Sequence, residues 1–142
     1  AHTPDALENA LLACKEHCHG VLWVVFGCGG DRDKGKRPLM AEAAEKFADH
    51  IVITNDNPRS ESPEAIAQDV LSGCEYPENA TIILEREQAV LKTLARAKAD
   101  DMVLLARKGH EDYIILGNEI VDYNEREVVK NFYLQHSQGV KA

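Results

Sequence analysis

Short apolar runs alternate along this chain with longer segments in which apolar residues recur at helical spacing. Four of the runs predict buried strands, because they are short, rich in β-branched or aromatic residues, and followed by polar or Gly-rich residues. These strands are expected at residues 21–26, 51–54, 81–84 and 102–106. The runs 114–116 and 120–121, separated by a Gly117-Asn118 turn, predict a β-hairpin.

The segments between the strands predict helices, two of which have clear start signals. Thr3-Pro4 and Ser62-Pro63 each place a capping hydroxyl before a proline at the first helical position. The first helix is expected from about Pro4 to about Cys18, with an apolar face made of Leu7, Ala10, Leu11 and Cys14. The others are expected from near residue 38, with Met40, Ala43, Ala44 and Phe47 facing the sheet, from 62 to about 71, from about 86 to 98, and from 124 to 135.

This alternation predicts an α/β fold with a doubly wound, mostly parallel sheet and an antiparallel edge formed by the hairpin. With 142 residues, 44% of them hydrophobic and 28% charged, the chain is expected to form a single domain over residues 1–142. The carboxyl ends of parallel strands meet at one edge of a sheet, and α/β proteins bind ligands there. The loops that follow the strands at 21–26, 51–54 and 102–106 are therefore the candidate binding loops.

The polar side chains of these loops suit a small zwitterion. Asn57 and Arg59 offer an amide and a planar fork of donors to a carboxylate, and Arg32 offers a second cation. Glu111 can pair with an ammonium group. Pro58 restrains its neighbour Asn57 to extended conformations, which stiffens the loop. The alternative is that Asp56 and Pro58 only end the strand and that Arg59 is solvated, and the local sequence leaves both readings open.

The Gly-rich loop after the first strand matches neither of the common phosphate-binding motifs. From Gly30 it satisfies most of a P-loop pattern, but Arg37 stands where a Ser or Thr hydroxyl should bind magnesium. As a dinucleotide fingerprint it lacks the third glycine, because position 32 is arginine. Lys34 or Lys36 can face a phosphate, whereas a solvated basic turn is the alternative for Lys36 and Arg37.

Cysteine, histidine and charge patterns exclude several other functions. Cys14 and Cys18 lie one helical turn apart, with His17 and His19 beside them. A second ligand pair at zinc-site spacing is missing, so these cysteines are expected to be free thiols rather than metal ligands. With 16 basic and 24 acidic residues the net charge is −8, which disfavours binding to nucleic acid or anionic membranes. The absence of a membrane-length apolar run and of a leader favours a cytoplasmic location.

Three motifs in the same order resemble the C-terminal domain of the MurE-type Mur ligases, and the resemblance covers essentially the whole chain. They are Phe26-Gly27-Cys28-Gly29-Gly30-Asp31-Arg32-Asp33-Lys34-Gly35-Lys36-Arg37-Pro38, Asp56-Asn57-Pro58-Arg59, and Lys108-Gly109-His110-Glu111-Asp112-Tyr113. The resemblance implies a Rossmann-like domain of an ATP-dependent, amide-bond-forming ligase of peptidoglycan biosynthesis. The version of the loop that reads Asp-Asn-Pro-Arg implies meso-diaminopimelate as the amino acid added to UDP-MurNAc-L-Ala-D-Glu.

The resemblance also implies roles for individual residues. Arg59 and Asn57 would hold the distal carboxylate of diaminopimelate, Glu111 its distal ammonium and Arg32 the other carboxylate. Asp56, Pro58 and Arg107 complete the implied substrate-binding set, and His2 and Lys34 are implied on the nucleotide side. Catalytic residues and metal ligands are not expected here, because in this family a central domain holds most of the ATP and Mg²⁺ contacts. The chain alone is therefore expected to be inactive.

One position departs from the family pattern. Arg107 replaces the glycine that relatives adding diaminopimelate usually carry, and its side chain is expected to face solvent, because a second guanidinium would compete for Glu111. An alternative function of a different class is a freestanding nucleotide-binding α/β module whose acidic surface docks a partner. The missing phosphate-binding fingerprints weigh against that alternative.

Overall fold

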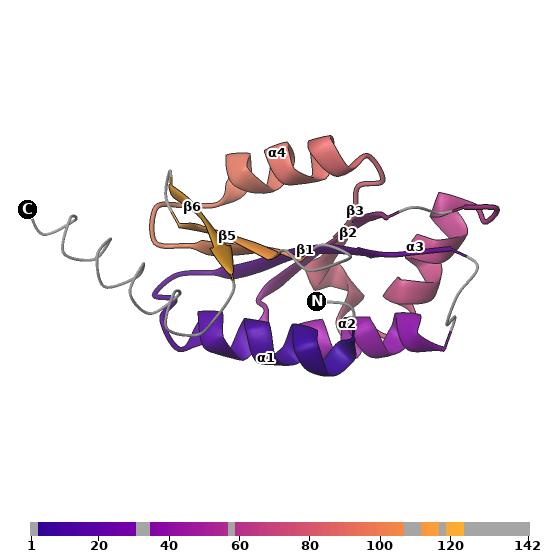
Figure 1. Cartoon of the computed structure of the whole chain (residues 1–142), viewed down its shortest axis with the longest axis horizontal. Helices are drawn as coiled ribbons and strands as arrows, with labels where there is room; N and C mark the ends of the chain where they lie inside the picture. The colour runs from indigo at the N-terminus through magenta and orange to yellow at the C-terminus, as the bar shows by residue number, and fades with distance from the viewer. Residues whose placement is uncertain (1–2, 31–34, 57–58, 107–111, 117–118, 124–142) are drawn as a thin grey trace, which may run out of the picture.

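The computed structural model describes residues 3–30, 35–56, 59–106, 112–116 and 119–123 of the chain. It contains helices on both sides of one central sheet (Figure 1). In chain order the elements are α1 (Pro4–Lys15), β1 (Leu22–Cys28), α2 (Lys36–Phe47), β2 (His50–Asn55), α3 (Pro63–Leu71), the short 3-10 helix η1 (Pro77–Asn79), β3 (Ala80–Ile82), α4 (Arg86–Arg96), β4 (Met102–Leu105), β5 (Asp112–Leu116) and β6 (Glu119–Tyr123).

The sheet has six strands in the order β3-β2-β1-β4-β5-β6. The first four strands in this order are parallel, and β5 and β6 form an antiparallel hairpin beside β4. The predicted doubly wound, mostly parallel sheet with an antiparallel edge is therefore confirmed. The chain winds outward from β1 to β3 and then returns to the other side of β1 with β4, so the strand order reverses between β1 and β4.

Helices cover the two faces of the sheet unequally. On one face α1, α2 and α3 bury Leu7, Leu11, Met40 and Val70 against a sheet surface that includes Phe26. On the opposite face α4 is the one helix among the described residues, with Ala89 fully buried against strand side chains such as Val25 and Val103. Both faces of the central strands are thus covered, which explains why these strands are continuous apolar runs in the sequence rather than alternating ones.

The predicted start signals of the helices are confirmed by their capping geometry. The backbone N–H of Ala6 donates to Thr3 Oγ1 at 3.1 Å, and the N–H of Ala65 donates to Ser62 Oγ at 3.3 Å. Each bond satisfies one of the N–H groups that the first turn of a helix leaves without an internal partner. Helix α1 ends at Lys15 rather than near Cys18, and α2 begins at Lys36, two residues before Pro38.

A cluster of polar contacts around Asp101 stabilises the amino ends of the strands. Asp101 is 5% exposed and accepts hydrogen bonds from Val21 N at 2.8 Å, Lys98 N at 2.9 Å and Trp23 Nε1 at 3.1 Å. Burial alone would raise the pKa of Asp101. The three hydrogen bonds together lower it by more than burial raises it, so the pKa lies below its usual value. The carboxylate therefore ties the start of β1 to the turn that precedes β4.

Two of the predicted elements lie outside the described residues. They are the helix expected at residues 124–135 and the Gly117-Asn118 turn of the hairpin. The strands that flank this turn are described and form the predicted hairpin, with Leu116 opposite Glu119. Within the described ranges, no helix is both long enough and apolar enough to span a membrane.

Candidate functional site

The two loops that follow β1 and β2 begin side by side at the carboxyl edge of the sheet. In the parallel pairing Gly27 lies opposite Thr54, and Cys28 lies opposite Asn55. A Cβ atom at position 27 would collide with the carbonyl oxygen of Thr54 and would lie 3.1 Å from Cβ of Asp56. Glycine is therefore required at position 27 because the ends of the two strands approach so closely. The two loops therefore emerge at the same edge of the sheet, as expected for parallel strands.

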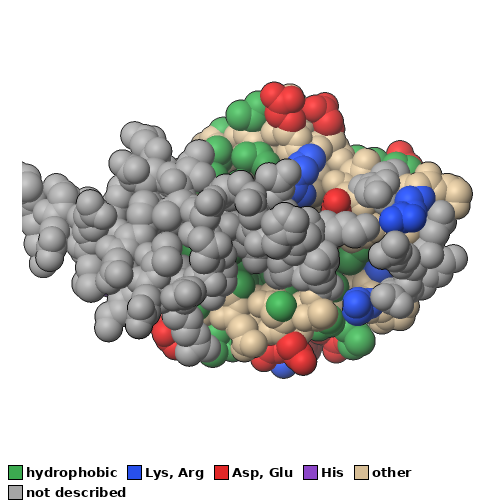
Figure 2. All heavy atoms as spheres, in the orientation of Figure 1, with side chains coloured by type: hydrophobic (Ala, Val, Ile, Leu, Met, Phe, Trp, Pro, Cys, Tyr) green, Lys and Arg blue, Asp and Glu red, His purple; other side chains and the backbone are tan. Residues whose placement is uncertain are grey.

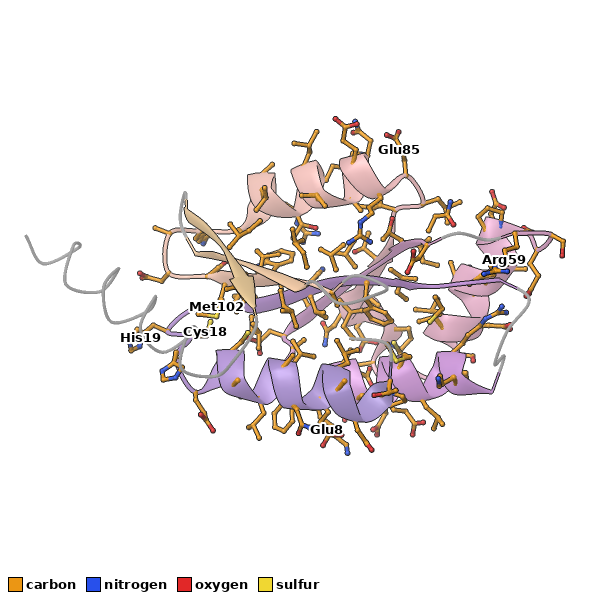
Figure 3. The ribbon with its side chains drawn as sticks, in the orientation of Figure 1. Glu8, Cys18, His19, Arg59, Glu85 and Met102 are labelled. Carbon is orange, nitrogen blue, oxygen red and sulfur yellow. The ribbon has the colours of Figure 1, made fainter. Side chains whose placement is uncertain are left out.

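Arg59 lies in the β2–α3 loop in a backbone conformation that arginine rarely adopts. Its φ is +55°, and it is the only non-glycine residue in the described ranges with a positive φ. Such a conformation costs about 1 to 3 kcal/mol and occurs mostly where function requires it. The side chain is exposed at the end of the molecule toward which β1 and β2 run (Figure 3). On the face shown in Figure 2, some Lys and Arg side chains are visible near this same end.

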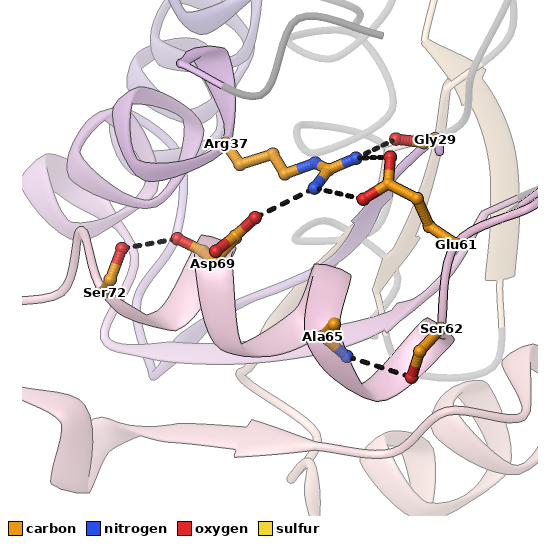
Figure 4. Close-up of polar contacts among 7 residues, drawn as sticks. All are labelled: Gly29, Arg37, Glu61, Ser62, Ala65, Asp69 and Ser72. Carbon is orange, nitrogen blue, oxygen red and sulfur yellow. Dashed lines mark hydrogen bonds and ion pairs between the residues drawn. The ribbon is translucent and has the colours of Figure 1, made fainter. Parts of the chain in front are cut away.

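Arg37 lies behind this loop and is buried, so a solvated basic turn is the wrong description of this residue. Only 1% of it is exposed, and its guanidinium donates to both carboxylate oxygens of Glu61, at 2.7 and 3.0 Å. It also donates to Asp69 Oδ2 at 2.9 Å and to the carbonyl oxygen of Gly29 at 3.1 Å (Figure 4). A buried guanidinium needs such partners, because an unpaired charge in the protein interior is strongly destabilising.

The contacts of Arg37 join three segments around the site. Gly29 directly follows β1, Glu61 lies two residues after Arg59, and Asp69 belongs to α3. The hydrogen bond to Glu61 is the main cause that raises the pKa of Arg37 above its usual value. The two terminal nitrogens of this cation thus bind two carboxylates and a carbonyl group, while its buried Nε has no hydrogen-bond partner among the described residues.

The thiol of Cys28, at the end of β1, is not suited to act as a nucleophile. Burial raises its pKa to about 11, and the nearby cations Arg37 and Lys36 offset only part of that increase. Because the thiolate is the reactive form, a thiol with this pKa remains protonated and unreactive at neutral pH.

Only two of the residues predicted for the site fall within the described part of the chain. Asp56 is half-buried directly after β2, and Arg59 is exposed three residues later. The other predicted residues lie outside the described ranges; they are His2, Arg32, Lys34, Asn57, Pro58, Arg107 and Glu111. The roles predicted for those seven residues therefore remain predictions.

Sequence reasoning missed three residues at this edge. Glu61 and Asp69 bind Arg37, and Asn55 ends β2 with its Oδ1 buried and without a hydrogen-bond donor among the described residues. The sequence contained a weak signal for Asn55, which begins the Asn-Asp-Asn-Pro-Arg run. It contained none for the two acids, because they are 24 and 32 residues from Arg37 and the fold alone brings them to it.

The described residues around Arg37 and the cysteines bear on the P-loop and metal-site alternatives. Arg37 occupies the position of the P-loop hydroxyl, and its guanidinium is already bound to Glu61 and Asp69. Within the ranges that the structure describes, no three His, Cys, Asp or Glu side chains are grouped so that they could hold a metal ion. Cys18 and His19 lie at the opposite end of the molecule from Arg59 (Figure 3), and Cys14 is buried in the core.

Comparisons with known proteins identify relatives of the whole chain. The chain is 57% identical to the UDP-N-acetylmuramoyl-L-alanyl-D-glutamate--2,6-diaminopimelate ligase of Vibrio cholerae over 130 residues, which are 92% of this chain and 26% of that protein. It is 52% identical to the ligase of the same name from Haemophilus influenzae over 132 residues, which are 93% of this chain and 27% of that protein. The chain thus spans about a quarter of the length of these relatives.

A solved structure of a protein with the same name confirms the fold. It superposes with a TM-score of 0.73 at 40% sequence identity and covers 97% of this chain and 28% of that chain. Residues 1–109 match the family described as "Mur ligase, glutamate ligase domain". The chain therefore belongs to the Mur ligase family, in which it corresponds to the glutamate ligase domain.

Proposed function

We propose that this chain is the C-terminal, amino-acid-binding domain of an ATP-dependent ligase that adds meso-diaminopimelate to UDP-MurNAc-L-Ala-D-Glu in peptidoglycan synthesis. The observation that carries the proposal is the 57% identity, over 92% of the chain, to a protein named as a 2,6-diaminopimelate ligase. The position of Arg59, on a restrained backbone at the carboxyl edge of the sheet, supports it.

In this proposal the chain binds and orients the incoming amine. Diaminopimelate carries a carboxylate and an ammonium group at each end, so a site for it must pair charges of both signs. Arg59 can give a planar, two-point contact to the distal carboxylate, and Asn57 can add an amide donor. Glu111 would pair with the distal ammonium. When the amine is held within attack distance of the activated carboxyl group, positioning itself accelerates amide formation.

The remaining predicted residues complete the proposed site. Arg32 would hold the second carboxylate, and Asp56 and Pro58 would shape the loop that carries Arg59. Arg107 would face solvent at the rim of the site. In this assignment none of the site residues forms a covalent bond to the substrate, and the chain contributes specificity and orientation rather than chemical activation.

ATP and Mg²⁺ would be bound mainly by other parts of the complete ligase, with His2 and Lys34 of this chain on the nucleotide side. The residue at position 37 supports this division, because a P-loop needs a Ser or Thr hydroxyl there and this chain has an arginine that binds Glu61 and Asp69. We also propose a cytoplasmic location. Its support is that Cys14, Cys18, Cys28 and Cys74 are not joined in disulfides.

The proposal is tested in a complete ligase that contains this chain. Amide formation from UDP-MurNAc-L-Ala-D-Glu, ATP and Mg²⁺ is measured with meso-diaminopimelate or L-lysine as the amine. Lysine lacks the distal carboxylate that Arg59 would bind, so its kcat/KM is expected to be lower by about 30-fold or more. Arg59→Ala should raise the KM for meso-diaminopimelate by about 30- to 150-fold, which corresponds to about 2 to 3 kcal/mol.

Lys15→Ala provides the control for a general loss of positive charge. Lys15 is an exposed cation at the last turn of α1, at the amino ends of the strands, so this variant should retain the wild-type KM. Equal kcat/KM values for lysine and meso-diaminopimelate would contradict the proposal. The alternative of a freestanding nucleotide-binding module would be favoured if the 142-residue chain bound ATP tightly and meso-diaminopimelate not at all.

A further inference from the structure

The printed contacts of Arg37 among the described residues do not include Arg59, yet one of its partners, Glu61, lies in the loop that carries Arg59. Its contact with Glu61 is a fork, in which two terminal nitrogens meet the two carboxylate oxygens at 2.7 and 3.0 Å. Two-point, charge-assisted contacts of this kind fix the orientation of both groups as well as their separation. Glu61 is 17% exposed and Arg37 is 1% exposed, so the fork is also well shielded from competing water.

The fork lies very close in sequence to the strained residue. Arg59 has a φ of +55°, and only Ser60 separates it from Glu61. Helix α3 begins immediately after Glu61, where Ser62 caps its first turn. The downstream side of Arg59 is therefore held at two consecutive positions, by the Arg37–Glu61 fork and by the helix cap. An arginine in the left-handed backbone conformation persists only if the surrounding structure holds it in place.

Arg37 makes a second contact that does not involve this loop. Its Nη1 lies 2.9 Å from Asp69 Oδ2 in the second turn of α3, on a side chain that is 52% exposed. This contact joins α2 to α3, and it lies ten residues beyond Arg59 in the sequence. Arg37 therefore makes one ion pair with the binding loop, through Glu61, and one with α3, through Asp69. The two ion pairs can be removed separately by mutation.

We propose that Arg37 is a positioning residue for the amino-acid substrate, which acts through Glu61 to hold the β2–α3 loop in the conformation that presents Arg59. This inference rests on the proposed function, because it assumes that Arg59 binds the carboxylate of the incoming amino acid. Without the Arg37–Glu61 contact the guanidinium of Arg59 is still present, but it occupies several orientations instead of one. Binding of the carboxylate must then restore one orientation, which weakens substrate affinity.

The test compares Glu61→Gln with Asp69→Asn in the complete ligase. Both variants replace a carboxylate partner of Arg37 by an amide of the same shape, so each weakens one of the two ion pairs of Arg37. Glu61→Gln is expected to raise the KM for meso-diaminopimelate about tenfold, equivalent to about 1.4 kcal/mol, while the KM for ATP stays within about twofold. Asp69→Asn should leave both KM values within about twofold. Urea unfolding of each variant records any loss of stability separately.

A double mutant shows whether Glu61 acts through Arg59. If it does, adding Glu61→Gln to Arg59→Ala should raise the KM by less than about twofold beyond Arg59→Ala alone, because effects within one unit do not add. Arg37→Lys, which keeps the charge but cannot span both oxygens of Glu61, should raise the KM in the same direction.

Three results would overturn the inference. They are an equal rise in KM for Asp69→Asn, a parallel rise for ATP and meso-diaminopimelate in Glu61→Gln, or full additivity with Arg59→Ala. Failure of the proposed function has a different signature: Arg59→Ala itself would leave the KM for meso-diaminopimelate unchanged, and both proposals would then be rejected. If Arg59→Ala raises the KM and Glu61→Gln does not, only the positioning role of Arg37 is rejected.

Discussion

Replacement of Arg59 by glycine should separate the function of this residue from the stability of the fold. At a φ of +55° an L-residue with a Cβ is strained by roughly 1 to 2 kcal/mol, and glycine is not. Glycine also gives the unfolded chain more freedom, which lowers stability by about 0.4 to 1 kcal/mol. The difference predicts that Arg59→Gly is about 0.5 to 1 kcal/mol more stable than the wild type. Arg59→Ala keeps the Cβ and should change stability by less than about 0.5 kcal/mol, because the side chain is exposed.

Urea unfolding followed by fluorescence measures this difference. Trp23 is the only tryptophan of the chain and is 5% exposed within the sheet, so its emission reports global unfolding. For an unfolding slope of about 1 to 3 kcal/mol per molar urea, the midpoint of Arg59→Gly should lie about 0.2 to 1 M above that of Arg59→Ala. A glycine variant that unfolds at or below the midpoint of the alanine variant would refute the claim that Arg59 is held in a strained conformation.

Three further predictions concern the described residues around the sheet. Asp101→Ala leaves one buried and two partly buried N–H donors without their acceptor and should lower the free energy of unfolding by about 2 to 4 kcal/mol in urea titrations; a loss below about 1 kcal/mol would contradict the hydrogen-bonding scheme. Burial and the nearby cation Arg96 lower the pKa of His50 below its usual 6.5. The stability that comes from neutral His50 is therefore fully present above pH 6.5 and is lost as the pH falls through the folded-state pKa. His50→Gln should therefore flatten the decline of stability between about pH 7 and pH 5, and an unchanged decline would rule out His50 as its source. Gly27→Ala should cost about 1 to 3 kcal/mol because the new methyl group meets the backbone of Thr54, whereas Gly35→Ala, where a Cβ meets no atom within 4 Å, should be nearly neutral in the same assay.

The sequence was sufficient for most of the fold because the relevant signals are local. Thr3 and Ser62 are capping residues that act on the next three positions, and the strand at 51–54 is a continuous β-branched run. The boundaries shifted where the local signal was ambiguous. Lys36 and Arg37 belong to α2 although Pro38 resembles a helix start, and the short helix Pro77–Asn79 has too few residues to produce a periodic pattern.

The candidate site was less predictable because it depends on tertiary contacts. A basic run such as Lys34-Gly35-Lys36-Arg37 resembles a solvated turn, and only the folded chain brings Glu61 and Asp69 to the guanidinium of Arg37. The left-handed backbone of Arg59 also has no sequence signal, since glycine or asparagine usually marks such a position. The interactions that hold the loop in place therefore could not be predicted from the sequence, and the residues assigned to ligand binding remain predictions.

The most direct test of the central claim is an NMR titration of the ¹⁵N-labelled chain with meso-diaminopimelate. If the carboxyl edge of the sheet binds the amino acid, saturable amide shifts should concentrate at residues 27–30 and 54–61, with little change at the amino-edge cluster around Asp101. The same titration with Arg59→Ala should need a concentration about 30- to 150-fold higher for half-saturation. Saturable shifts that cluster around Asp101 or on α4, or that are unaffected by Arg59→Ala, would contradict the assignment of this edge as the amino-acid site.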